Sequence, residues 1–335
     1  MTTPAGNTRI FVAITPEESD RLYDESTRAR LAGLGEVTWS KDGSLPADLA
    51  DAYDVLITSW STGKFAPEAV IGERLRLAVH TAGTIRGLFP RSVLEQGLRL
   101  AQGGSAPMAV PVAELSLTLT LALLRNLHWM DRRLQATRDW SKSGLGRLTH
   151  GIREQSIGIV GLSRTGREYA SMVTGLGVQT VRAFDPYVGP DDAAALGVEL
   201  VDLAELCATS DVLAIHAPVT EQSRHMLDQD MIGRLRDGAI VVNTARSAVI
   251  DMEALSEQLV SGRLSAGLDV FDVEPLAADS PLYGLDNVLI TPHVAGGTIE
   301  ARFAQGAGVT DEIVAFLSEE PMHYEVTADI YDRLS

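Results

Sequence analysis

Short apolar runs, separated by polar and helix-like stretches, recur along the whole chain. In the first hundred residues these runs are β-branched or alternate with polar residues, and Gly, Asp or Pro bounds them, which predicts strands. The predicted strands lie at residues 9–14, 36–40, 54–59, 75–82 and 98–102. The segments between them have the helix-then-strand rhythm of α/β units.

A second series of apolar runs begins after Gln155. These runs are nearly continuous, as expected for parallel strands that are buried on both faces of a sheet. They lie at residues 156–161, 180–185, 212–218, 239–245, 265–271 and 287–293. Helical segments separate them, so this part of the chain is expected to form a doubly wound parallel sheet.

Two of the helical segments carry recognisable signals. After Gly166, apolar residues recur at helical spacing until two further glycines end the segment. Asp251 is expected to cap a second helix, with Ile250 and Leu255 placed for a hydrophobic staple and Gly262 just past its end.

The most apolar stretch of the chain runs from Val110 to Leu127. Its leucines first alternate with polar residues, which fits a strand, but its length and its closing apolar residues favour a buried helix. Four polar residues interrupt it, so it is expected to be too polar and too short to span a bilayer.

Length and composition bound the function. The 335 residues are enough for two domains, each with its own core. The formal net charge of −17 argues against a nucleic acid or an anionic membrane as partner. Cys207 is the only cysteine, which excludes an intramolecular disulfide and a cysteine metal cluster. With no signal-peptide pattern at the N-terminus, we expect a cytoplasmic protein without a bound metal.

A glycine-containing turn follows the first strand of the second series. Gly161, Ser163 and Gly166 fit the dinucleotide fingerprint G-x-G-x-x-G, with serine at its second glycine. A helix follows whose N-terminus would face a diphosphate. Asp185, roughly twenty residues later, stands where a ribose-binding carboxylate belongs. The glycine turn alone also fits an ordinary strand–turn–helix unit, and Asp185 with Pro186 could form an ordinary turn. The glycine turn, the helix and Asp185 together favour a nucleotide site.

Other polar groups follow the remaining strands of this sheet. Ligands of open α/β sheets bind beyond the carboxyl ends of the strands. At those ends stand His216-Ala217-Pro218, Thr244-Ala245-Arg246, Asp269 followed by Glu274, and His293. A lone histidine there is often structural, and Glu274-Pro275 could simply start a loop. An arginine, an acid and a histidine beyond strands of one sheet together favour catalysis.

These motifs carry a resemblance to a known family. The stretches GIVGLSRTG, FDPY, HAPVTEQSRHML, VVNTARSAVID, GLDVFDVEPL and LITPHVAGGT resemble, in order and spacing, the D-isomer-specific 2-hydroxyacid dehydrogenases. The resemblance is strong from about residue 155 to 298. It implies an NAD-binding Rossmann domain, residues 107–298, inserted into a flavodoxin-like α/β substrate domain made of residues 1–106 and 299–335. It also implies a homodimer.

The same resemblance implies the roles of the site residues. Arg246 would bind the substrate, His293 would act as acid/base and Glu274 would be its partner. These residue types suit the reaction, because an arginine fork grips a carboxylate, and a histidine transfers a proton near neutral pH. The implied NAD-binding residues are Gly161, Ser163, Arg164, Thr165, Gly166, Asp185, His216, Ala217, Pro218, Thr220, Thr244, Ala245, Asp269 and His293. Among them, Asp269 would bind the carboxamide group of the nicotinamide.

The substrate end is less readable. In the family, backbone amides of a glycine-rich loop hold the substrate carboxylate. The corresponding residues here are Ala82, Gly83 and Thr84, which are expected to bind the substrate in addition to Arg246. Arg86 could add a second cation or be structural. Trp60 could wall the pocket or pack in the core.

Two serines depart from the family pattern. Ser163 brings a Cβ to the pyrophosphate, where it could crowd a phosphate or donate its hydroxyl to one. Ser247 follows Arg246, where the family usually has glycine. Neither removes a reacting group.

Three functions fit these observations. The first is an NAD-dependent oxidoreductase that transfers a hydride between nicotinamide and a D-2-hydroxy acid or its 2-oxo acid. The second is a non-enzymatic NAD(H)-sensing protein of the same fold, similar to corepressors, against which the lack of a long disordered tail or a basic patch argues. The third is a dehydrogenase for another small molecule such as formate, whose extra amide contacts are not found here.

Overall fold

The computed structural model describes residues 8–83, 85–104 and 106–331. The chain divides into two compact units, each of which is described by itself. Unit 1 consists of Met1–Met108 and Gly297–Ser335, and unit 2 consists of Ala109–Gly296.

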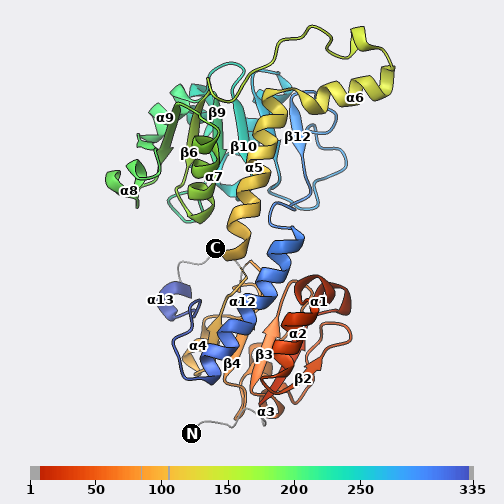
Figure 1. The fold of residues 1–335 in the computed structure, drawn as a ribbon. Helices are drawn as coiled ribbons and strands as arrows, with labels where there is room; N and C mark the ends of the chain where they lie inside the picture. The colour runs from red at the N-terminus through yellow and green to blue at the C-terminus, as the bar shows by residue number, and fades with distance from the viewer. Residues whose placement is uncertain (1–7, 84, 105, 332–335) are drawn as a thin grey trace. The chain divides into compact units, whose positions relative to one another are not determined.

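Unit 1 contains a five-stranded parallel sheet in the order β2-β1-β3-β4-β5 (Figure 1). Its strands are β1 (Arg9–Ala13), β2 (Glu36–Trp39), β3 (Val55–Thr58), β4 (Leu77–His80) and β5 (Arg99–Ala101). All five match the apolar runs of the first hundred residues, so these predicted strands are confirmed.

Helices cover both faces of this sheet, because its central strands β1, β3 and β4 are buried on both sides. Ile10 and Val12 of β1 pack in one cluster, whereas the alternate residues Phe11 and Ala13 pack in another. Val309 of α12 belongs to the first cluster, so a segment from the C-terminal part of the chain completes this core. The helices of unit 1 are α1 (Pro16–Leu22), α2 (Glu25–Ala32), α3 (Leu49–Ala52), α4 (Ser92–Glu95), α12 (Ile299–Leu317) and α13 (Ala328–Tyr331).

Unit 2 contains a seven-stranded parallel sheet in the order β12-β11-β10-β9-β6-β7-β8. Its strands are β6 (Ser156–Val160), β7 (Thr180–Phe184), β8 (Glu199–Leu200), β9 (Val212–Ile215), β10 (Ile240–Asn243), β11 (Ser265–Leu268) and β12 (Val288–Ile290). Six of them confirm the predicted second series. The sequence analysis missed β8, because two residues are too few to show a period.

Successive residues of the unit 2 strands enter different cores, which makes the sheet doubly wound. Ile159 packs with Tyr169 of α7, whereas the next residue, Val160, packs with Leu206 of α9 and Leu255 of α11. The helices of unit 2 are α5 (Ala109–Leu124), α6 (Leu127–Thr137), α7 (Arg164–Gly175), α8 (Pro190–Ala194), α9 (Leu203–Thr209), α10 (Gln229–Arg234) and α11 (Met252–Val260).

Three predicted helices are confirmed. The most apolar stretch forms α5. The expectation that it is too polar and too short to span a bilayer is wrong, because residues Ala106–Leu124 are long and apolar enough to cross a membrane by length and composition. Leu119 and Leu123 of α5 belong to a core cluster of unit 2. The segment after Gly166 forms most of α7. Asp251 caps α11 by accepting hydrogen bonds from the backbone of Glu253 and Ala254.

Candidate active site

The turn between β6 and α7 requires glycine at two positions. Gly161 has a positive φ of 92°, and a Cβ there would lie 2.7 Å from the backbone nitrogen of Ala217. A Cβ on Gly166 would lie 2.0 Å from the carbonyl oxygen of Gly161. Both distances are shorter than any ordinary carbon contact, so the first and third glycines of the fingerprint are sterically required.

Ser163 occupies the position of the second glycine without strain. Its φ of −60° is open to any residue, and it is the N-cap of α7. The hydroxyl donates to the carbonyl of His216 at 2.9 Å and accepts from the backbone N–H of Gly166 at 3.4 Å. The hydroxyl hydrogen is therefore already donated to a protein carbonyl, which argues against a hydrogen bond from this hydroxyl to a phosphate.

The glycine turn lies where the strand order of the sheet reverses. The first strand, β6, pairs with β7 on one side and with β9 on the other, and ligands of doubly wound sheets bind at such a switch point. Asp185 follows β7, and its two carboxylate oxygens accept from the backbone N–H groups of Leu162 at 2.7 Å and Tyr187 at 2.8 Å. The Asp185 carboxylate is thus fixed next to the glycine turn, at the position expected of a ribose-binding acid. This arrangement fits a dinucleotide site.

His216, after β9, contributes its backbone rather than its ring to this turn. The ring is buried beside Tyr169, with 5.0 Å between the ring centroids. Burial lowers the pKa of His216 to about 3, so the imidazole is neutral at physiological pH. Neither ring nitrogen has a hydrogen-bond partner among the described residues.

The segment after His216 is held by a serine that the sequence analysis missed. The Ser223 hydroxyl donates to the carbonyl of Pro218 at 2.6 Å and accepts from the backbone N–H of Thr220 at 2.7 Å. Ala217 is buried against the glycine turn. Arg164 is exposed and Thr165 half-buried in the first turn of α7, beside the site.

An asparagine shapes the turn that carries Arg246. Asn243, at the end of β10, donates to the carbonyl of Arg246 at 3.0 Å and accepts from the backbone N–H of Ala245 at 3.0 Å. Thr244 is buried and shares a 2.5 Å hydrogen bond with Ser116 of α5. The Arg246 side chain is exposed at the carboxyl edge of the sheet. The sequence analysis missed Asn243, although a polar residue at the end of an otherwise apolar strand could have indicated its role.

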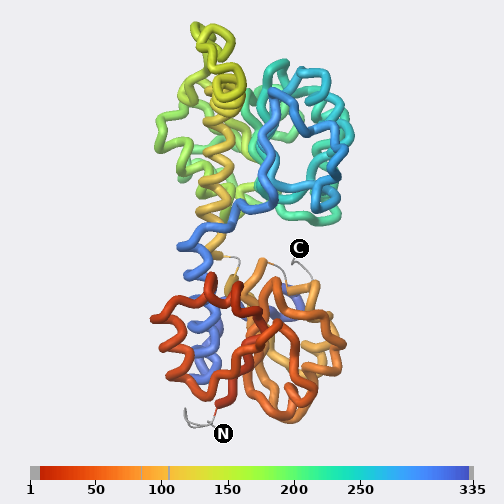
Figure 2. The backbone as a smooth tube through the Cα atoms, turned by 90° about the vertical axis from the view of Figure 1, so that its right-hand side faces the viewer, coloured from red at the N-terminus to blue at the C-terminus, as the bar shows by residue number. Residues whose placement is uncertain are grey.

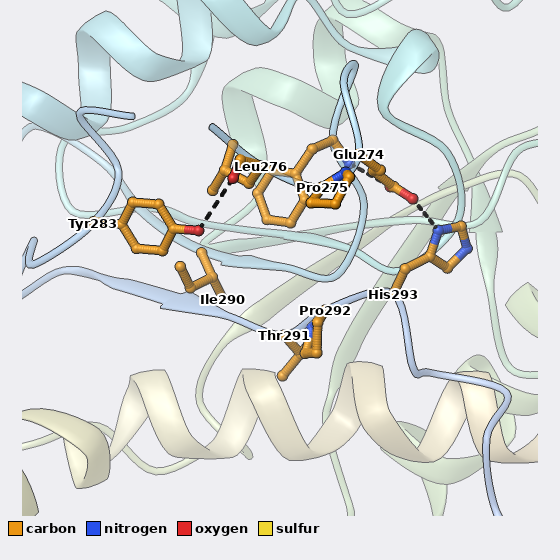
Figure 3. Close-up of a pocket in the computed structure, with 9 residues that line it drawn as sticks. Glu274, Pro275, Leu276, Tyr283, Ile290, Thr291, Pro292 and His293 are labelled. Atoms are coloured by element: carbon orange, nitrogen blue, oxygen red, sulfur yellow. Dashed lines mark hydrogen bonds and ion pairs between the residues drawn. The ribbon is translucent and has the colours of Figure 1, made fainter. Parts of the chain in front are cut away.

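Glu274 and His293 point toward one another (Figure 3). The Nδ1 atom of His293 lies 2.6 Å from Oε2 of Glu274, and Oε1 accepts from the backbone N–H of Phe271 at 2.9 Å. Burial by itself raises the pKa of Glu274, but these hydrogen bonds and the charges of His293 and Arg246 outweigh it and lower the pKa below its usual value. The carboxylate is therefore ionised at neutral pH and fixes the imidazole orientation.

Asp269 holds the segment on which His293 stands. His293 has a positive φ of 53°, a conformation that is uncommon outside glycine and that clusters at functional sites. The fully buried Asp269 carboxylate accepts from the Thr291 hydroxyl and from the backbone N–H groups of Val294 and Ala295, at 2.5, 2.9 and 2.9 Å. These contacts on both sides of His293 stabilise its backbone. The expected contact of Asp269 with the nicotinamide carboxamide stays a prediction.

A mostly apolar pocket of about 550 Å³ lies beside the Glu274–His293 pair (Figure 3). It is lined by Phe271, Glu274, Pro275, Leu276, Tyr283, Ile290, Thr291, Pro292 and His293. The pocket places an apolar wall beside the pair, whose side chains stay partly exposed, 48% for His293 and 35% for Glu274.

The expected substrate residues of unit 1 lie at the carboxyl edge of its own sheet. Ala82 is buried and Gly83 half-buried after β4, and Thr84 lies outside the described residues. Trp60, two residues beyond β3, is 51% exposed, so the interpretation as a core tryptophan is wrong. Arg86 packs over the ring of Tyr331 at 5.3 Å, in keeping with a structural role.

Within the described ranges, no group of three or more His, Cys, Asp or Glu side chains is arranged to hold a metal ion.

Comparisons with known proteins agree with this geometry. Residues 117–295 match the family model of the D-isomer specific 2-hydroxyacid dehydrogenase NAD binding domain. A hydroxypyruvate reductase of Thermotoga maritima is 35% identical over 78% of this chain and 83% of its own length. A D-3-phosphoglycerate dehydrogenase of Methanocaldococcus jannaschii is 32% identical over 90% of this chain, which spans only 57% of that relative.

Solved structures show the same similarity. The structure of a D-2-hydroxyisocaproate dehydrogenase superposes with a TM-score of 0.83 at 25% identity, covering 96% of this chain and 99% of that one. Nothing in these similarities supports a non-enzymatic NAD-sensing protein. The chain therefore belongs to the D-isomer-specific 2-hydroxyacid dehydrogenases, a family of NAD-dependent oxidoreductases that interconvert D-2-hydroxy acids and 2-oxo acids.

Proposed function

We propose that this chain reduces a 2-oxo acid to the D-2-hydroxy acid with NADH, and catalyses the reverse oxidation, through Arg246, His293 and Glu274. The observation that carries the proposal is the 2.6 Å contact between His293 and an ionised Glu274 beyond β11 and β12, with Arg246 beyond the neighbouring β10. An oriented acid/base and a cation at one sheet edge are what this reaction requires.

Each of these residues performs a distinct step. Bound NADH supplies the hydride. Arg246 binds the carboxylate of the 2-oxo acid with its planar fork and polarises the adjacent carbonyl. His293 donates a proton from Nε2 to the carbonyl oxygen, while Glu274 holds Nδ1 and stabilises the protonated ring. The backbone amides of Ala82 and Gly83 stay predicted donors to the substrate carboxylate.

The proposal is tested by following NADH oxidation with glyoxylate, hydroxypyruvate, pyruvate, 2-oxoisovalerate and phenylpyruvate. We expect turnover of at least one acid and a product of D configuration from each acid that is reduced, except glyoxylate, whose product glycolate is achiral. NADH binding without turnover of any of them would contradict the proposal and favour a binding protein. An L product would contradict the assigned stereochemistry.

A homodimer formed through unit 2 is part of the proposal. The helix α6 and the segment after it project beyond the sheet of unit 2 (Figures 1 and 2). No residue of α6 is buried, and Trp140 is 71% and Leu148 94% exposed. Such apolar side chains on a projecting segment support contact with a second copy of the chain. Sedimentation of the wild type and of Leu148→Asp measures it, and a monomeric wild type would contradict it.

A cytoplasmic location also stays a prediction, which rests on the single cysteine of the chain.

A further inference from the structure

Asn243, at the carboxyl end of β10, is a fully buried polar side chain with no part in the reaction steps described above. Its Oδ1 accepts from the backbone N–H of Ala245 at 3.0 Å, and its Nδ2 donates to the carbonyl of Arg246 at 3.0 Å. Both ends of one side-chain amide are therefore bound to the turn that carries Arg246. All residues of this turn belong to unit 2.

The guanidinium of Arg246 is bound to the same turn. Its Nη1 donates to the carbonyl of Ala245 at 2.8 Å. This carbonyl belongs to the peptide unit between Ala245 and Arg246, and Asn243 binds the peptide units directly before and after it. Asn243 thus fixes the direction of the Ala245 carbonyl from both sides, and this carbonyl in turn fixes the guanidinium.

The other N–H donors of Arg246 are left for the substrate. The Ala245 carbonyl is the hydrogen-bond partner of this guanidinium within the part of the chain that the structure describes. A guanidinium carries five N–H donors in one planar fork, so binding one of them sets the direction of the others. An arginine that is held in this way meets a carboxylate with its fork already oriented, which lowers the entropy cost of binding.

The turn is also joined to the histidine side of the site. Asp269, just after β11, donates its backbone N–H to the carbonyl of Asn243 at 2.9 Å. The Asp269 carboxylate holds the segment around His293. Two fully buried side chains at the ends of the adjacent strands β10 and β11 therefore place Arg246 and His293.

We propose that Asn243 is a positioning residue of this enzyme, whose amide sets the guanidinium of Arg246 for the 2-oxo acid through the Ala245 carbonyl. This inference rests on the proposed function. Asn243 acts through Arg246 and not on the substrate, since its side chain is fully buried. A displacement of a substrate-binding group by about 1 Å can lower the rate by about 10²-fold, so the placement of this arginine matters for turnover.

Asn287 supplies a matched control in the same unit. Its Nδ2 donates to the carbonyls of Leu259 and Leu264 at 2.8 and 2.7 Å. It directly precedes β12 and so lies at the amino edge of the sheet, opposite the edge that carries Arg246. Asn287→Ala therefore removes hydrogen bonds between a side-chain amide and the backbone, as Asn243→Ala does, but leaves the turn of Arg246 untouched.

Steady-state kinetics at saturating NADH compare the two variants. Asn243→Ala should lower kcat/KM for the 2-oxo acid by about 10- to 100-fold, the effect of a misplaced binding group. Asn287→Ala should keep a kcat/KM close to that of the wild type. Equal effects of the two substitutions, or none in Asn243→Ala, would overturn the inference.

A double-mutant cycle separates positioning from a merely structural role. Arg246→Lys keeps a cation but lacks the fork that the turn orients, and substitutions of residues that act as one unit are not additive. Asn243→Ala should therefore change kcat/KM much less in Arg246→Lys than in the wild type. A loss by the same factor in both backgrounds would show that Asn243 acts independently of Arg246 and would overturn the inference.

Asn243→Ser is the conservative variant. A serine hydroxyl can accept from the N–H two residues on, but it is too short to bind the Arg246 carbonyl as well. It should restore part of the kcat/KM that Asn243→Ala loses. If Asn243→Ala does not fold, Asn243→Ser replaces it in the comparison with Asn287→Ala and in the cycle, with the same criteria.

Crystal structures of the NADH-bound proteins separate failure of this inference from failure of the proposed function. Nη1 of Arg246 should lie on the Ala245 carbonyl in the wild type and be displaced from it in Asn243→Ala or Asn243→Ser. If the wild type reduces no 2-oxo acid, the proposed function fails, but a displaced guanidinium still supports its placement by Asn243. A guanidinium in the same position in wild type and variant would overturn the inference, whatever the turnover.

Discussion

The Nδ1 atom of His293 lies 2.6 Å from Oε2 of Glu274, which joins residues beyond the adjacent strands β12 and β11 into one acid/base unit. The pKa of Glu274 is lowered, so this carboxylate stays ionised as pH falls through neutrality and is lost as a partner only in acid. Over the working pH range the anionic partner of His293 is therefore constant.

Glu274→Gln should shift the pH profile of 2-oxo acid reduction. The amide keeps a hydrogen bond to Nδ1 but removes the negative charge, so the protonated imidazole is populated only at lower pH. The pH at which kcat falls should move toward acid by about one unit. Steady-state rates from acid to alkaline pH measure it, with Glu199→Gln, a surface ion-pair variant, as control. An unchanged profile would remove Glu274 from its role.

His293→Ala should separate chemistry from cofactor binding. The imidazole acts on the substrate proton, so turnover should fall by about 10²- to 10⁴-fold, the usual worth of a general acid. NADH affinity should change little, since the glycine turn and Asp185 are untouched. Rates and fluorescence titration of NADH check both parts. Loss of NADH binding equal to the loss of turnover would show that His293 mainly supports the nucleotide site.

Arg246→Lys should raise KM for the 2-oxo acid and lower kcat. A lysine keeps the charge but cannot form two parallel hydrogen bonds to a carboxylate. We expect kcat/KM to fall by at least tenfold, or about 1.4 kcal/mol. Arg236→Lys, at a surface ion pair with Asp211, is the control. Wild-type kinetics in Arg246→Lys would show that this residue does not hold the substrate.

NADH should be preferred over NADPH because Asp185 would repel a 2′-phosphate. The nearby Arg182 does not compensate, since it pairs with Glu199 at 3.0 Å. Asp185→Ala should weaken NADH binding and reduce the preference, as it removes both the ribose acceptor and the contact with Leu162. The ratio of kcat/KM for the two cofactors measures this. Similar values for both in the wild type would contradict the assignment.

Ser163 should matter more for the stability of α7 than for the affinity for NADH. Ser163→Ala removes the N-cap and the bond to the His216 carbonyl, which should lower the free energy of unfolding by about 1–2 kcal/mol in urea. NADH affinity in Ser163→Ala and Ser163→Gly should change by less than about tenfold, or roughly 1.4 kcal/mol. Ser171→Ala, exposed on the same helix, is the control. An increase in NADH affinity of more than about tenfold in Ser163→Gly would instead indicate that the Ser163 side chain crowds the pyrophosphate.

The sequence by itself determined the elements and the nucleotide turn. Strand periodicity and helix caps are local properties, so the long strands and the Asp251 cap could be read directly. Gly161 and Gly166 could be predicted because the turn leaves no room for a Cβ at either position, and their spacing forms a short motif. The two-residue strand β8 was not readable, since it exists only through its pairing with β7.

Only the tertiary structure decided which polar side chains are engaged and which remain available. The ring of His216 is buried beside Tyr169, and the Asp269 carboxylate holds the segment around His293; neither contact could be predicted from the sequence. Trp60 is half exposed, and Arg302, from the far end of the chain, stacks on its ring. Such contacts join residues that are distant in sequence, and hydrogen bonds and burial between them leave no period or motif in the local pattern.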